Sequence, residues 1–153
     1  MIIEQKQRTT RRYKKLRNAL GKKNIDKEFE SSFDFIFQAS KGVNADVIKN
    51  FAEYFNLSRE TTASLLNVSS PTIYRWIRTH KKLDKNLSSK LFEIADLFLY
   101  GTEVFGNKEN FFKWTGLPNT ALGGMKPMEI IELSEGVSKV RDVLLRIEYG
   151  VFS

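Results

Sequence analysis

The sequence predicts an all-α protein with two helical domains behind a basic tail. Apolar residues recur every three or four positions along most of the 153-residue chain, as they do on one face of an α-helix. We find no sustained alternation of apolar and polar residues, the pattern of a half-buried strand. One stretch, residues 58–80, also has the caps and corner of a helix-turn-helix. We therefore expect a tail at 1–27, a helix-turn-helix domain at 28–86 and a second helical domain at 87–153.

The first segment is strongly basic, and only Glu4 and Asp26 oppose its positive charges. Tyr13, Leu16 and Leu20 share a helix face, but this stripe is too narrow to bury on its own. We expect a flexible tail. Either it is simply solvated, or it orders along DNA phosphates with an affinity that falls steeply as the salt concentration rises. The basic residues are Lys6, Arg8, Arg11, Arg12, Lys14, Lys15, Arg17, Lys22 and Lys23.

The segment after the tail is expected to form two helices that pack beneath the helix-turn-helix. A dense apolar cluster opens it, and clusters of this kind usually form core rather than a binding surface. Its members are Phe29, Phe33, Phe35, Ile36 and Phe37. The second helix is expected within residues 43–55, where five apolar side chains share a face. These are Val47, Ile48, Phe51, Ala52 and Phe55.

The next stretch has the local signals of a helix, a tight turn and a second helix. Ser58 can cap the first helix by accepting a backbone N–H, and Asn67 tolerates the left-handed backbone of a corner. Ser69 or Ser70 can cap the second helix. Pro71 then falls at its first position, where a missing N–H costs nothing.

The second of these helices has two chemically different faces. The apolar stripe is expected to contain Ile73, Trp76, Ile77 and His80. Arg75 and Arg78 point the opposite way, as donors do on a recognition helix that reaches guanine edges or phosphates. The alternative is an ordinary helical hairpin with a solvated basic face. The candidate DNA-binding residues lie on and beside the outer face: Ser70, Thr72, Tyr74, Arg75, Arg78 and Thr79.

A long helix is predicted over residues 87–105. Its main apolar stripe is Leu87, Leu91, Ile94 and Phe98, and its second side is apolar as well. A helix that is apolar on two sides must be covered on two sides, and in a short chain another copy can supply one cover. Because helix-turn-helix proteins commonly pair so that two recognition helices meet adjacent major grooves, we expect a homodimer.

The remaining residues predict three shorter helices. Asn107 can cap the first, a turn-rich loop follows, and Pro127 opens the second. The last helix runs to about Tyr149. Its inner face is expected to be Val137, Val140, Leu144 and Ile147. Its outer face carries Lys139, Asp142, Arg146 and Tyr149, and Phe152 follows in a short apolar tail.

Composition argues against several classes of function. The chain has no Cys and a single His, so disulfides and metal sites built from His and Cys are excluded. We find no phosphate-loop, dinucleotide-binding or nucleophile-elbow motif, and we expect neither an enzyme nor a cofactor. No apolar run approaches the roughly 18 residues that span a bilayer, and the start lacks a signal-peptide core. We expect a cytoplasmic protein without a membrane partner, and the net charge of +7 favours a polyanion such as nucleic acid.

The last third of the chain carries an ordered set of motif residues. They are Trp114, the pair Pro118 and Asn119, Ala121 to Gly124, Pro127, Gly136, and Arg146 to Gly150. This segment resembles the C-terminal toxin-binding domain of the Xre/MbcA/ParS antitoxins. The resemblance extends upstream through the helix-turn-helix, over roughly residues 43–152. Lys126 departs from the pattern, which usually has Ser or Thr before this Pro, so we expect a weaker cap. The basic tail does not map onto the pattern.

The resemblance implies an antitoxin of a type II toxin–antitoxin pair, whose usual partner is a RES-domain toxin that consumes NAD. Such an antitoxin dimerises, represses its own operon by binding operator DNA, and covers the toxin's active site with its C-terminal region. Exposed charged and aromatic side chains suit such an interface. The expected toxin-binding residues are Lys139, Arg146, Tyr149 and Phe152. One alternative concerns Phe152, which could fold back onto the core instead of contacting a toxin. The other concerns the function, since the protein could be a stand-alone regulator whose second domain serves only dimerisation.

Overall fold

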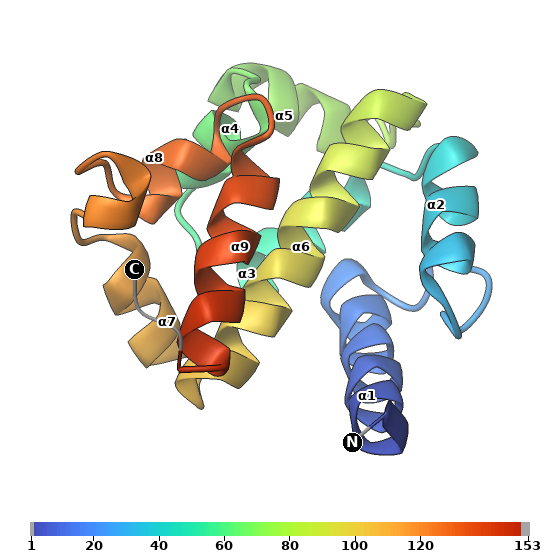
Figure 1. The fold of residues 1–153 in the computed structure, drawn as a ribbon. Helices are drawn as coiled ribbons and strands as arrows, with labels where there is room; N and C mark the ends of the chain where they lie inside the picture. Colours follow the sequence, from blue (N-terminus) through green and yellow to red (C-terminus); the bar gives the residue numbers. More distant parts are fainter. Residues whose placement is uncertain (1, 151–153) are drawn as a thin grey trace. The chain divides into compact units, whose positions relative to one another are not determined.

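In the computed structural model, residues 2–150 are described, and over that range the chain is helical with no strand. The expectation of an all-α fold is therefore confirmed. The chain divides into two compact units, residues 1–96 and 97–153, and each is described by itself (Figure 1). The predicted boundary after residue 86 differs from this division, because one long helix contributes its first half to one unit and its second half to the other. Among the described helices, none has the length and apolar character needed to cross a membrane.

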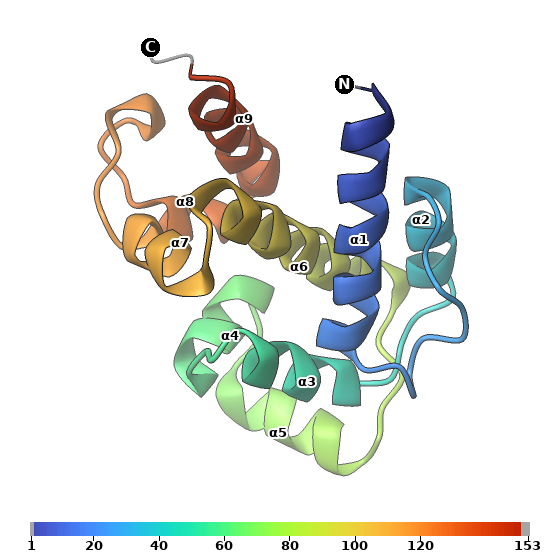
Figure 2. The same ribbon diagram turned by 90° about the horizontal axis from the view of Figure 1, so that it is seen from below.

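Four short helices, the long helix α1 and the first half of a second long helix surround the core of the first unit. α3, α4 and α5 pack on one another, and α1 packs on α3 (Figure 2). Burial raises the pKa of the Tyr54 phenol, whose ring lies edge-on to Phe55 with 4.9 Å between ring centroids. The helices are α1 (Ile2–Leu20), α2 (Ser32–Ser40), α3 (Asp46–Tyr54), α4 (Arg59–Leu66), α5 (Ser70–Arg78) and the first half of α6 (Lys85–Phe105).

The basic segment differs from the expectation of a flexible tail, because it forms α1 and buries one side. Leu16, Ala19 and Leu20 are fully buried, and Ala19 widens a stripe that seemed too narrow from the large residues alone. Arg12 Nε donates to Asp96 Oδ1 at 2.9 Å, and each of the two side chains is only 13% exposed. The second half of α1 is thus an integral part of the first unit.

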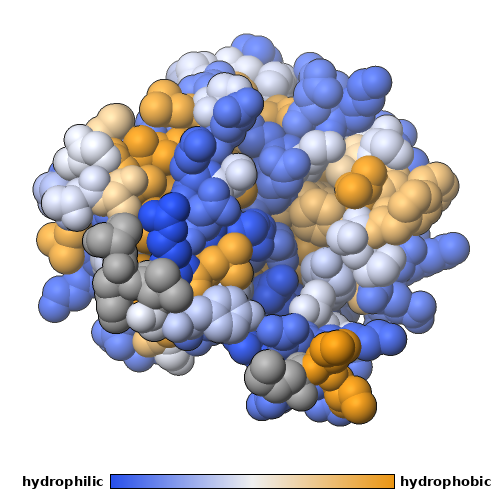
Figure 3. All heavy atoms as spheres, viewed as in Figure 1, coloured by the Kyte–Doolittle hydropathy of each residue, from blue (hydrophilic) through white to orange (hydrophobic). Residues whose placement is uncertain are grey.

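The aromatic cluster near α2 was expected to be core, and this is wrong for three of its five members. Phe29 is buried, and its ring and that of Phe35 both make edge contacts with Phe92, at centroid distances of 5.9 and 5.3 Å. A helix can turn only one side to the core, so the opposite side of this doubly apolar segment faces outward. The residues left exposed are Phe33, Ile36 and Phe37, at 72%, 62% and 54%. An apolar patch over α2 is visible in Figure 3.

The second unit has a cluster of contacting aromatic rings at its core. The ring of Phe111 lies 5.8 Å from that of Phe98 and 6.2 Å from that of Trp114, measured between centroids. A Cβ at Gly101 would stand 2.1 Å from the Phe111 ring, so α6 and α7 can approach this closely only at glycine. The elements are the second half of α6, α7 (Lys108–Thr115), the 3₁₀ turn η1 (Thr120–Leu122), α8 (Pro127–Ile131) and α9 (Gly136–Glu148).

Substitution of Leu16 tests whether α1 is packed as described. Leu16→Ala should lower the free energy of unfolding by about 2–5 kcal/mol, because it removes a fully buried side chain and leaves a cavity. Lys15→Ala, on the exposed side of the same helix, should change it by less than about 0.5 kcal/mol. Urea unfolding followed by circular dichroism measures both values. Equal unfolding midpoints for the two variants would show that this helix does not pack on the unit.

Candidate nucleic-acid and partner interfaces

The two helices of the helix-turn-helix begin at side-chain caps. Ser58 Oγ accepts the backbone N–H of Thr61 at 3.1 Å, and Ser69 Oγ accepts that of Thr72 at 3.3 Å. Of the two serines considered for the second cap, Ser69 is therefore the one used. Each cap satisfies a backbone donor that the first turn of a helix leaves without a helical partner.

The corner between α4 and α5 has the backbone that the sequence predicted. Asn67 has φ of +53° and ψ of +41°, in the left-handed region. The N–H of Val68 donates to the carbonyl of Ala63 at 3.1 Å, which closes the end of α4. Ala63 is 8% exposed, and its small side chain lets the two helices come close. These contacts set the direction in which α5 leaves the corner.

The outer face of α5 presents the predicted arginines to solvent. Arg75 and Arg78 are both exposed, and Tyr74 beside them is 60% exposed. Thr79 is also exposed, and its hydroxyl donates to the carbonyl of Arg75 at 2.8 Å. Long donors thus project from a helix whose opposite side is held in the core, which is the arrangement needed for reading a major groove.

Ser70 and Thr72, the other two candidates, are half-buried at the start of α5. The Thr72 hydroxyl accepts a hydrogen bond from Ser69 Oγ at 2.7 Å, so this side chain also takes part in the cap. All six candidate residues therefore lie on α5 or directly after it, with four of them outward and two at its amino end.

The buried stripe of α5 is shorter than expected. Ile73 is buried, and Trp76 and Ile77 are half-buried, but His80 is exposed, which corrects its assignment to the inner face. The helix ends at Arg78, and His80 has φ of +51°, so the backbone turns the ring out of the helical register. His80 Nδ1 lies 3.2 Å from Asp46 Oδ2 at the start of α3.

The turn-rich loop of the second unit is organised around Asn119. Its Oδ1 accepts the N–H of Ala121 at 2.9 Å, and its own N–H donates to the carbonyl of Met125 at 3.0 Å. Gly123 and Gly124 have φ of +67° and +83°, where other residues are strained. The Asn and the glycines of this motif are thus needed for the shape of the loop.

The corner between α8 and α9 depends on two further motif positions. A Cβ at Gly136 would stand 1.7 Å from the carbonyl oxygen of Ile130, so only glycine fits there. At the start of α8, Lys126 supplies no side-chain cap, as expected. Instead the Glu129 carboxylate accepts the N–H of Lys126 at 3.1 Å and ties this first turn together.

The outer face of α9 presents three of the four predicted partner-binding residues. Lys139 and Arg146 are exposed, and Tyr149 is 59% exposed. Phe152 lies outside the described residues. Leu145, which is 38% exposed one turn before Tyr149, was not predicted from the sequence. Its only signal in the sequence was that an apolar residue stands next to the charged face. On the inner side, the Tyr100 hydroxyl donates to the Glu148 carboxylate and holds the end of α9 on α6.

Two family models match consecutive parts of the chain. Residues 34–99 match the antitoxin Xre-like helix-turn-helix domain. Residues 101–150 match the antitoxin Xre/MbcA/ParS C-terminal toxin-binding domain. Residues 1–33, which include α1, lie outside both matches.

Two relatives carry antitoxin names. The chain is 25% identical over 132 residues to the Prs ADP-ribosylating antitoxin of Sphingobium sp. (strain YBL2), covering 80% of this chain and 83% of the relative. It is 27% identical over 79 residues to Antitoxin Xre of Pseudomonas putida (strain KT2440), covering 52% of this chain and 50% of that relative. The order of the two domain matches is the order of the two units. The chain therefore belongs to the Xre/MbcA/ParS family of antitoxins, with a DNA-binding helix-turn-helix domain followed by a toxin-binding domain.

Proposed function

We propose that this protein neutralises a cognate NAD-consuming, RES-type toxin by covering its active site, and that it represses its own operon by binding operator DNA. The observation that carries this proposal is the pair of exposed polar faces, one on α5 of the DNA-binding domain and one on α9 of the toxin-binding domain. The name of the Sphingobium relative refers to ADP-ribosylation, a transfer that consumes NAD, and this supports the toxin class. We place the protein in the cytoplasm, where operator DNA and NAD are both found.

The chemistry of α9 suits the covering of a polar active site. Arg146 presents a planar set of donors that can bind a carboxylate through two hydrogen bonds. Tyr149 adds a large, rigid surface that loses little conformational entropy on binding, and residues of these two types dominate the energetics of many interfaces. Lys139 lies two turns before Arg146, on the same side of the helix. The three side chains therefore form a strip along α9 rather than a single point of contact.

Operator binding is expected to depend on the arginines of α5. Arg75→Ala and Arg78→Ala should each weaken binding to the DNA upstream of the gene by about 1–3 kcal/mol, if each reads a base edge. Lys113→Ala, which removes the same charge from an exposed site on α7, should have little effect. Fluorescence anisotropy with a labelled duplex measures the affinities. An unchanged affinity in both arginine variants would exclude them from the base contacts.

Toxin neutralisation is expected to depend on the outer face of α9. Tyr149→Ala should weaken toxin binding by at least about 2 kcal/mol, or roughly 30-fold, if this side chain is an interface anchor. The matched control is Tyr74→Ala, because Tyr74 is an equally exposed tyrosine that lies on α5, outside the toxin-binding domain. Calorimetry with the product of the adjacent gene measures binding, and growth during co-expression measures neutralisation. Equal rescue and equal binding by both variants would contradict this assignment.

A toxin-free outcome would favour the second reading of the chain. If the neighbouring gene product neither binds this protein nor slows growth, while the protein still binds operator DNA, the stand-alone regulator is correct. If the protein bound neither the product of the neighbouring gene nor operator DNA, both readings would be contradicted.

We also propose that the protein is a homodimer and that its contact lies on α2. The sequence placed the dimer contact on the second side of α6, but Leu97, Leu99 and Tyr100 are buried in the structure. The large apolar side chains left exposed on α2 are Phe33, Ile36 and Phe37, and the rings of the two phenylalanines stack at 6.5 Å between centroids. In a two-fold dimer the same patch of each copy would face its equivalent on the other copy. A patch of apolar side chains can pack against itself in this way.

A charge placed on this patch should separate the two copies. Ile36→Glu should give the monomer mass in light scattering, because an unpaired carboxylate would be buried in the contact. Ser32→Glu adds the same charge at an exposed position of the same helix and should leave the mass of the wild type unchanged. The same mass for both variants would contradict a dimer contact on α2. If Ile36→Glu kept the mass of the wild type but lost toxin binding, the patch would be part of the toxin-binding surface instead.

A further inference from the structure

The segment that follows α1 is held firmly on the DNA-binding domain, although it lies outside both family matches. The Asn50 side chain donates to the carbonyl of Leu20 at 3.1 Å, which ties the end of α1 to α3. The Arg17 guanidinium donates twice to the carbonyl of Ile25, from Nε at 3.1 Å and from Nη2 at 3.0 Å. These bonds hold the chain on both sides of the short turn formed by residues 21–24.

The backbone of the turn favours glycine as its first residue. Gly21 has φ of +94°, and a Cβ there would stand 2.2 Å from the Asn50 amide nitrogen. The N–H of Asn24 donates to the carbonyl of Gly21 at 3.0 Å and closes the turn. Lys22 and Lys23 are thereby carried to a defined place on the domain, with both side chains exposed.

A cavity of about 500 Å³ lies between this turn, the start of α3 and the end of α5. Its one carboxylate is that of Asp46, which lies 3.2 Å from His80 Nδ1. The positive side chains that line it come from three separate elements, so they converge on one space. They are Lys22, Lys23, Lys49 and Arg78.

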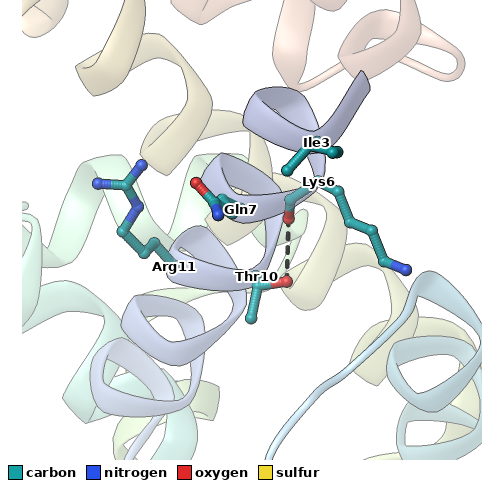
Figure 4. A pocket seen from close by; sticks show the side chains of 5 residues that line it. All are labelled: Ile3, Lys6, Gln7, Thr10 and Arg11. Carbon is teal, nitrogen blue, oxygen red and sulfur yellow. Dashed lines mark hydrogen bonds between the residues drawn. The ribbon is translucent and has the colours of Figure 1, made fainter. Parts of the chain in front are cut away.

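In a second hollow the positive side chains do not point into one space. It is lined only by α1, and Figure 4 shows the side chains of Lys6 and Arg11 pointing away from each other. Thr10 donates its hydroxyl hydrogen to the carbonyl of Lys6 at 2.9 Å, so this polar group serves the helix itself. We assign no ligand to this hollow.

We propose that the cavity beside Arg78 binds a phosphate of the DNA backbone next to the major groove that α5 enters. This inference rests on the proposed operator binding through α5. Arg78 lies both on the outer face of α5 and in the lining of the cavity, so the two surfaces are continuous. The site adds a contact from outside the family-matched region to the surface that faces DNA.

Because the cavity lies at the carboxyl end of α5, an anion can bind there only if other positive groups offset the dipole of that helix. The carboxyl end of a helix carries a partial negative charge, which disfavours an anion near the last residues of α5. Lys22, Lys23 and Lys49 supply positive charge at this end. A phosphate can then lie against the end of the recognition helix with a net electrostatic gain. Such a contact positions the protein on the duplex but does not read its sequence.

The test compares the full-length protein with a double variant, Lys22→Ala/Lys23→Ala. The probes are a duplex from the region upstream of its own gene and a scrambled duplex of equal length and composition. The affinity for each is measured over a series of salt concentrations. We expect the slope of log K against log salt to become shallower by about 1 for each lysine removed. We also expect the same fold-loss on both duplexes, so the preference for the operator is unchanged.

The matched control is Lys6→Ala/Arg11→Ala, which removes two charges from the hollow on α1 that shows no convergence. It should change the slope much less. All four side chains are exposed, so folding should be retained and is checked by circular dichroism.

Equal slopes for the two double variants, with operator binding by the wild type intact, would overturn the phosphate site alone. A loss confined to the operator duplex would mean that the lysines read bases, which also overturns it. A wild-type protein that binds neither duplex would overturn the proposed operator binding and this site together.

Discussion

Packing on α3 is the constraint on which the first unit depends. The apolar face of this helix is buried, with Val47, Ile48 and Phe51 at 1% exposure or less, and α1, α4 and α5 all pack on it. Its polar positions serve a second purpose, since Asn50 holds the end of α1 and Asp46 contacts His80 after the end of α5. A nine-residue helix thus sets the position of every element that faces the proposed DNA site.

Close contact at glycine plays the corresponding part in the second unit. Gly101 lets Phe111 pack directly against α6, and Gly136 lets α9 start against the carbonyl of Ile130. The positions of α7 and of the start of α9 follow from these contacts, and the hydrogen bond from Tyr100 to Glu148 holds the end of α9 on α6. As a result, the outer face of α9 can vary in chemistry without altering the core that holds it.

The helix-turn-helix was predictable because its signals are local. The caps at Ser58 and Ser69 and the left-handed corner at Asn67 depend on a few neighbouring residues, and each is present in the structure. The motif glycines were also recognisable, although their close contacts were not. The outward direction of Arg75 and Arg78 followed from helical spacing once the buried side had been located by Ile73.

The failures arose where the answer depended on distant residues. The periodicity of α1 was visible, but its packing depends on α3 and on the ion pair of Arg12 with Asp96, and both partners lie far along the chain. The segment around Phe33 was apolar on both sides, and nothing local decides which side of such a helix turns inward. His80 continued the helical spacing of the buried stripe, but the chain leaves the helix at Thr79. Spacing cannot place a residue once its helix has ended.

A division between affinity and specificity follows from the placement of charges around α5. The outer face of this helix has two arginines, and each base contact distinguishes sequences by only about 1–3 kcal/mol. Phosphate contacts strengthen binding to every sequence equally, so they raise affinity without changing the readout. Lys22 and Lys23 belong to the segment outside both family matches, whereas Arg75 belongs to the matched domain. If α5 binds operator DNA as proposed, changes in the amino-terminal segment would alter how tightly the operator is held, and how sensitive that binding is to salt, while the sequence read by α5 stays the same.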